Sequence, residues 1–73
     1  MKQLNEKIKE IREDNDFSQR EIAKILKISQ QSYSRYETGC GYIPAIHIKE
    51  LCKFYNVSAD YILGLTKDKY PID

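Results

Sequence analysis

The most restrictive feature of this chain is a pair of helix-start signals in its middle. Ser18 followed three residues later by Glu21 forms a capping box, which starts a helix. Ser29 is a second N-cap candidate, and the helix that begins after Ser29 should end at Gly39. The segment therefore predicts two short helices joined by a tight turn, at about residues 18–26 and 30–37.

Apolar residues at helical spacing predict two further helices. Leu4, Ile8 and Ile11 are such a set, and they indicate a first helix at about residues 3–14. Pro44, at a first-turn position, begins a helix. Its inward residues would be Ala45, Ile48, Leu51, Cys52 and Tyr55.

A final short helix is expected at residues 59–63. Ser58 can cap its start, Gly64 would end it, and Asn56 suits a left-handed end for the preceding helix. No segment alternates apolar and polar residues with period two, so the predicted fold class is all-α, a compact domain of five helices. We expect one domain at residues 1–65 and a short tail at 66–73.

Composition excludes several classes of protein. The chain has 73 residues and no apolar run near the roughly 20 that a membrane span needs. Cys40 and Cys52 fit neither a disulfide framework nor a zinc site. No catalytic constellation is present, and His47 has no partner at a spacing that suggests a triad. We therefore expect a reduced, cytoplasmic protein that is not an enzyme and has no cofactor, no metal and no membrane contact.

Positive charge is concentrated in the middle of the chain. The whole sequence has a net charge of +1, but the four basic residues and single acid of residues 17–36 give 4 − 1 = +3. These basic residues are Arg20, Lys24, Lys27 and Arg35. Such an excess fits a phosphate-binding surface or a solvated helix face equally well.

The second helix of the pair has a polar outward face. Ala23 is small enough to let two helix backbones cross closely, and Tyr33 and Tyr36 face inward. The outward residues are Gln30, Gln31, Ser34 and Arg35. A Gln amide can pair with adenine and an Arg guanidinium with guanine. The alternative interpretation is a solvated face with no ligand.

At residues 4–65 the chain resembles the helix-turn-helix domain of the lambdoid phage repressors and Cro proteins, including small bacterial regulators of the XRE type. The resemblance covers most of the chain and involves all five predicted helices. It is carried by Ile8 to Arg12, Ser18-Gln19, Ala23, Ile28-Ser29-Gln30, Ser34-Arg35-Tyr36-Glu37 with Gly39, and Asn56 to Gly64.

The resemblance implies a role for each matching residue. The helix at 30–37 would enter the DNA major groove, where Gln30, Gln31, Ser34 and Arg35 would contact bases. Arg12 would bond Glu37 and thereby support the recognition helix, together with Ala23, Tyr33 and Tyr36. The expected phosphate contacts are Gln19, Arg12, Arg20, Lys27, Ser29, Ser32 and Tyr42.

The sequence departs from the family pattern in two places. The turn between the two helices commonly has glycine in a left-handed conformation, and here it has Lys27, at a cost of roughly 1 kcal/mol. The loop after the recognition helix usually carries basic residues, but residues 40–43 are Cys, Gly, Tyr and Ile. Affinity for phosphate should therefore be modest or depend on dimerisation.

These features predict a sequence-specific transcriptional regulator, a repressor that binds double-stranded DNA and associates with the nucleoid when bound. Apolar residues in the last helix and tail, including Tyr70 and Ile72, indicate a homodimer on a palindromic operator or a tail that folds over the core. The alternative is an antitoxin-like protein-interaction module. A redox role for Cys40 is a minor third hypothesis, and His47 is expected to be an exposed helix residue.

Overall fold

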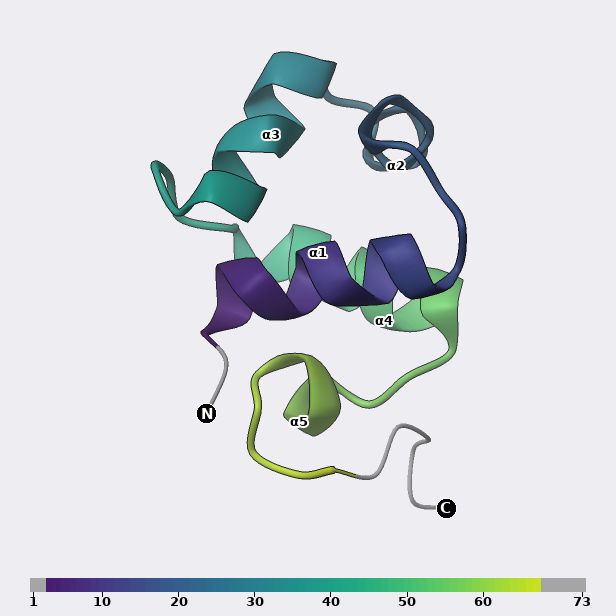
Figure 1. Ribbon diagram of the computed structural model, residues 1–73, viewed down its shortest axis with the longest axis vertical. Helices are drawn as coiled ribbons and strands as arrows, with labels where there is room; N and C mark the ends of the chain where they lie inside the picture. The colour runs from purple at the N-terminus through teal and green to yellow at the C-terminus, as the bar shows by residue number, and fades with distance from the viewer. Residues whose placement is uncertain (1–2, 68–73) are drawn as a thin grey trace.

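The computed structural model describes residues 3–67, which form five helices and no strand. The helices are α1 (Leu4–Asp14), α2 (Gln19–Leu26), α3 (Gln30–Thr38), α4 (Ala45–Tyr55) and α5 (Ala59–Ile62). In Figure 1, α1 crosses the middle of the molecule, with α2 and α3 on one side and α5 on the other. The predicted all-α class is confirmed, and each predicted boundary lies within about a residue of the observed one.

Local chemistry starts α2 and α3 where the sequence predicts. The Ser18 hydroxyl accepts a hydrogen bond from the Glu21 N–H, and the Glu21 carboxylate accepts one from the Ser18 N–H at 2.9 Å. The Ser29 hydroxyl accepts a hydrogen bond from the Ser32 N–H at 3.0 Å. Both N-caps are confirmed, because each satisfies donors that the first helical turn leaves without partners.

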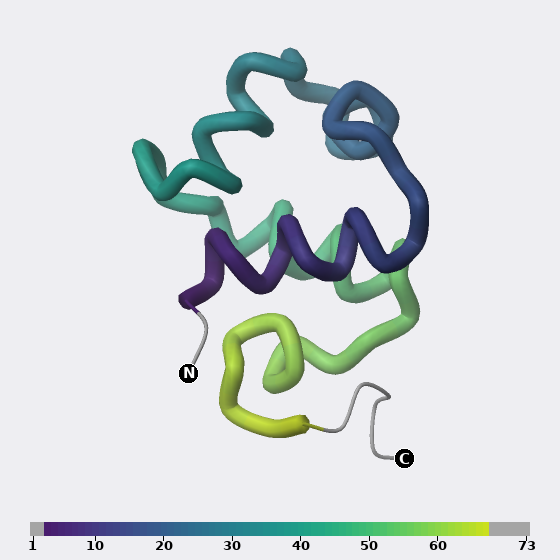
Figure 2. Tube along the Cα trace, viewed as in Figure 1, coloured from purple at the N-terminus to yellow at the C-terminus, as the bar shows by residue number. Residues whose placement is uncertain are grey.

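Three helices end in residues with a left-handed backbone. These C-caps are Lys27 (φ 60°), Gly39 (φ 82°) and Asn56 (φ 56°). After Lys27 the chain turns from α2 into α3. After Gly39 it passes through the loop that leads to α4, as the tube in Figure 2 shows. Lys27 therefore adopts the geometry for which glycine is the usual residue.

Replacing Lys27 by glycine is expected to raise the free energy of unfolding by about 0.5–1 kcal/mol, because relief of left-handed strain exceeds the added entropy of the unfolded chain. Urea unfolding followed by circular dichroism measures the change. The matched control is Lys24→Gly, inside α2, which should lower stability by about 1 kcal/mol. A loss of stability in Lys27→Gly would contradict the strain argument.

One apolar core joins all five helices. Its buried side chains are Ile8, Ile11, Ile22, Ala23, Leu26, Tyr33, Leu51, Val57, Tyr61 and Ile62. The inward stripes predicted for α1, α2 and α3 lie in or against this core. Packing of α2 against both α3 and α4, and of α1 against α3 and α5, fixes the position of α3 from several sides.

Three predictions for α4 need correction. Pro44 is the N-cap and not the first helical residue, and Ala45, expected to face inward, is exposed because it begins the helix away from the core. His47, expected to be exposed, is half-buried, and its Nδ1 lies 3.0 Å from the Tyr36 hydroxyl. The start of α4 therefore contacts the recognition-helix candidate α3 through a polar pair.

The short helix α5 completes the core and leads into the predicted tail. Gly64 follows it with a left-handed φ of 80°, as predicted for the end of this helix. The tail residues Tyr70 and Ile72 lie outside the described residues. Between residues 3 and 67, no helix is long and apolar enough to cross a membrane.

Candidate nucleic-acid interface

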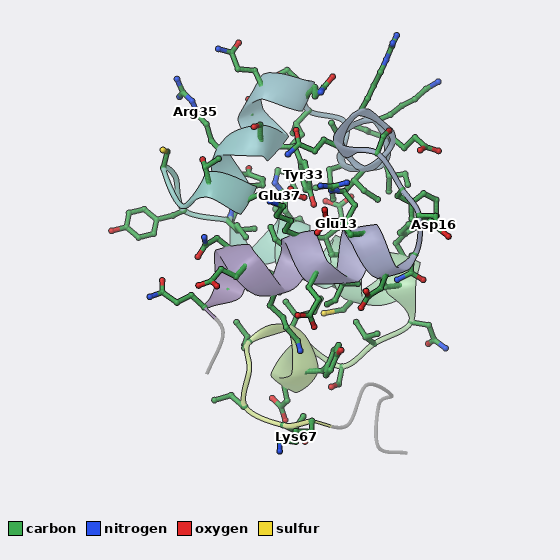
Figure 3. All side chains as sticks on the ribbon, in the orientation of Figure 1. Glu13, Asp16, Tyr33, Arg35, Glu37 and Lys67 are labelled. Atoms are coloured by element: carbon green, nitrogen blue, oxygen red, sulfur yellow. The ribbon has the colours of Figure 1, made fainter. Side chains whose placement is uncertain are left out.

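The outer face of α3 forms one polar surface with the start of α2. Gln30, Gln31 and Arg35 are exposed and Ser34 is half-buried. They line a shallow, open hollow together with Gln19 and Thr38. In Figure 3 the Arg35 side chain points away from the body of the molecule. Amide, hydroxyl and guanidinium groups are thus gathered on one side of α3.

Basic side chains lie beside this surface on α2 and its turn. Arg20, Lys24 and Lys27 are all exposed. Glu21 is the only acidic residue on α2, so α2 and its turn, which contribute Gln19 to the hollow, carry a net positive charge. A polyanion that approached α3 would therefore meet cations at its edge.

The two serines at the start of α3 differ in their free hydrogen-bonding capacity. The Ser29 hydroxyl caps the helix and also donates to the Ser32 hydroxyl at 2.9 Å. Its own hydrogen is therefore engaged within the protein. In that bond the Ser32 hydroxyl is the acceptor and keeps its own hydrogen for another partner, so Ser32 is the better placed of the two to donate to a phosphate.

The loop after α3 carries an isolated aromatic side chain. Tyr42 is 99% exposed, and Cys40, two residues before it, is an exposed free thiol. The hydroxyl and ring of Tyr42 face solvent on all sides, so the loop contributes a hydrogen-bonding group and no positive charge.

A buried ion pair holds α3 against α1. Arg12 donates through Nε to Glu37 Oε2 at 2.7 Å and through a second nitrogen to Glu37 Oε1 at 3.0 Å. Its third nitrogen donates to the Phe17 carbonyl at 2.8 Å. The two side chains are 11% and 2% exposed. The expected contact between Arg12 and Glu37 is present, whereas the predicted phosphate contact of Arg12 would have to use the little guanidinium surface that remains.

Glu37 has further partners that keep it ionised. Gln19 Nε2 donates to its Oε1 at 3.0 Å. Burial by itself would raise the pKa of Glu37, but the hydrogen bonds from Arg12 and Gln19 outweigh it and hold the pKa below the ordinary carboxyl value. The Tyr33 hydroxyl lies close to the same carboxylate, and burial followed by this negative charge raises the pKa of Tyr33. Figure 3 shows Tyr33 and Glu37 together between α3 and α1.

Sequence reasoning missed one residue of this surface, Thr38, and one residue that supports α3 from α1, Asn5. Thr38 lines the hollow, and the helical spacing of three and four residues from Gln31 through Ser34 to Thr38 is the signal that could have found it. Asn5 donates from Nδ2 to the Glu37 carbonyl at 3.2 Å and so satisfies a carbonyl at the end of α3. No local pattern indicates Asn5, because the contact joins residues far apart in the sequence.

Comparison with protein families and solved structures gives consistent results. A family model described as helix-turn-helix matches residues 8–62. A transcriptional regulator from Listeria innocua has a similar structure, with a TM-score of 0.82 over 96% of this chain and 65% of that one. The sequence identity is 16%, so this likeness concerns the fold alone.

Curated relatives are similar over most of this chain but are longer proteins. Antitoxin PezA of Streptococcus pneumoniae is 36% identical over 70 residues, which are 96% of this chain and 44% of PezA. The uncharacterized HTH-type transcriptional regulator YobD of Bacillus subtilis is 32% identical over 90% of this chain and 59% of its own length. The HTH-type transcriptional regulator ImmR of the same organism is 34% identical over 84% and 48%. The chain thus spans about half the length of these relatives.

Proposed function

The chain belongs to the helix-turn-helix family whose model matches residues 8–62, and we propose that it is a sequence-specific DNA-binding transcriptional regulator that acts as a repressor. The observation that carries the proposal is the polar hollow on α3. Gln30, Gln31, Ser34 and Arg35 share it, and α3 is held by a buried ion pair on its inner side. An exposed, rigidly supported helix with these groups suits the major groove.

In this proposal the groups divide between bases and phosphates. Gln30, Gln31, Ser34 and Arg35 contact base edges, and the neighbouring residues contact the DNA backbone. The backbone contacts are Gln19, Arg12, Arg20, Lys27, Ser29, Ser32 and Tyr42. Repression follows most directly, because a protein that occupies an operator needs no further surface in order to block access to it.

The proposed active form is a homodimer that pairs through α5 and the tail. Leu63 and Leu65 are 42% and 71% exposed, which leaves apolar surface near this end of the chain. Two copies related by a two-fold axis would place their α3 helices in successive major grooves, about 34 Å apart. A palindromic site follows from this arrangement.

Selection of bound oligonucleotides from a random pool tests the proposal. We expect enrichment of a site with two related half-sites separated by about one helical turn of DNA. Absence of any enriched sequence, at low salt and with folded protein, would refute sequence-specific binding. A single enriched half-site would retain the DNA-binding function and exclude the two-fold arrangement.

Arg35→Ala is expected to weaken binding to the selected site by roughly 5- to 150-fold per half-site, because a bidentate base contact discriminates by about 1–3 kcal/mol. Binding to random DNA should change much less. Arg20→Ala serves as the control, since removing a cation that contacts phosphate weakens binding to specific and random DNA alike. Equal weakening on both DNAs in Arg35→Ala would contradict base reading. Fluorescence anisotropy measures the six affinities, those of the unmodified protein and the two variants on each DNA.

The second candidate is an antitoxin-like module that binds a protein partner. Its support is the 36% identity to antitoxin PezA, together with exposed apolar side chains at Tyr42, Ile46 and Leu65. Stoichiometric recovery of one protein partner, without any enriched DNA, would favour this candidate. The two functions are compatible within one chain.

A further inference from the structure

The contact between Glu37 and Gln19 links the buried ion pair to the DNA-facing surface. Gln19 is the first residue of α2 and one of the residues lining the polar hollow, and its Nε2 donates to Glu37 Oε1 at 3.0 Å. The carboxylate that accepts this bond is 2% exposed and is held by two bonds from Arg12. A fixed buried group thus contacts a side chain that faces the hollow.

The chemistry of a carboxylate determines how the Gln19 amide is turned. An ionised carboxylate only accepts hydrogen bonds, so the nitrogen of the amide and not its oxygen must face Glu37. The second N–H of that nitrogen is then left for another acceptor. Because Arg12 neutralises Glu37, this acceptor can be an anion without strong repulsion from the carboxylate.

We propose that Glu37 is a positioning residue for DNA binding, whose carboxylate fixes the Gln19 amide so that its second N–H donates to a DNA phosphate. This inference rests on the proposed function and adds to it how the contact between Gln19 and a DNA phosphate is positioned. The orientation exists before DNA arrives, so binding need not immobilise a free glutamine side chain. The start of α2 also favours an anion at this position.

The side-chain amide signals of the unmodified protein test the geometry without DNA. In ¹⁵N-resolved NMR spectra, one Gln19 amide hydrogen should exchange with water more slowly than those of Gln30 and Gln31, which are exposed and serve as internal controls. Gln19 signals that match those of Gln30 and Gln31 would overturn the proposal, because the amide would then be free.

A double-mutant cycle on the selected DNA site tests the function. Glu37→Gln, measured where it is folded, should weaken binding roughly tenfold, about the effect of one hydrogen bond to a charged group. In the Gln19→Ala background it should cause no further weakening, whereas in the Gln31→Ala background the tenfold effect should persist. An equal effect in all three backgrounds would overturn the proposal and show that Glu37 acts only by supporting α3.

A second variant covers the case in which Glu37→Gln does not fold. Gln19→Asn keeps an amide but shortens its reach by one methylene, so it should bind DNA as weakly as Gln19→Ala. Affinity equal to that of the unmodified protein would overturn the positioning role. Failure of the unmodified protein to bind any selected DNA refutes the proposed function itself, and the positioning role with it, whereas normal binding with no coupling refutes the positioning role alone.

Discussion

Replacing Arg12 by alanine is expected to lower the free energy of unfolding by about 3–5 kcal/mol, which is the usual cost of leaving one member of a buried ion pair without its partner. Glu37 would keep its burial and its bond from Gln19 but would no longer receive either bond from the guanidinium. For a small domain this is a large part of the total stability. Thermal and urea unfolding measure the change.

Lys9→Ala is the matched control, because Lys9 is an exposed cation on the same helix. It should change stability by less than about 0.5 kcal/mol. A similarly small change in Arg12→Ala would show that the ion pair contributes little and that α3 is positioned by the apolar core alone.

The same substitution should change how stability depends on pH. In the unmodified protein, folding lowers the pKa of Glu37. The ionised carboxylate therefore stabilises the fold above the ordinary carboxyl pKa, and this stabilisation is lost as the pH falls through the pKa of Glu37 in the folded protein. Without Arg12, burial dominates and raises the pKa of Glu37, so protonation of Glu37 reduces the loss of stability in the variant. The stability difference between the two proteins should therefore shrink on acidification below about pH 5.

Affinity for the selected DNA site is expected to fall about 150-fold between 50 and 200 mM salt, from about four phosphate contacts per dimer and a slope of about −0.9 per contact. This expectation counts two cations in each protomer, Arg20 and Lys27, because the charge of Arg12 is already neutralised by Glu37 and the loop after α3 provides no cation. A protein with 6–10 contacts would lose roughly 10³–10⁵ in affinity over the same range.

Arg20→Ala should reduce this salt slope by about 2 in a dimer. Lys53→Ala, on the last turn of α4, is the control and should leave the slope unchanged. Binding that is independent of salt would contradict a phosphate-contacting surface. Titrations at four or more salt concentrations give the slopes.

Local chemistry made most of the fold predictable. The capping box at Ser18, the left-handed end of α4 at Asn56 and the apolar spacing in α1 all depend on residues within one or two turns of each other. Their conformations follow from nearby backbone donors and from side-chain spacing, so a sequence contains the necessary information. The left-handed geometry of Lys27 was instead expected from the family pattern of the turn. The errors in α4 are of another kind, since the exposure of Ala45 and the contact of His47 depend on what lies opposite them.

The same distinction between short-range chemistry and tertiary contacts applies to the candidate site. The face of α3 with Gln30, Gln31 and Arg35 is visible in the sequence, because helical spacing alone separates it from the inward tyrosines. The pairing of Arg12 with Glu37 came from resemblance to a family and not from spacing. The contacts of Glu37 with Gln19 and Asn5 were not expected at all.

The sequence by itself therefore determined the five helices, their caps and the polar face of α3, since each arises from short-range backbone and side-chain chemistry. Only the tertiary structure decided which groups surround Glu37. Three elements meet there, and their crossing brings Arg12, Gln19 and Tyr33 to one buried carboxylate. Hydrogen bonds of 2.7–3.0 Å require positions that no one-dimensional pattern specifies.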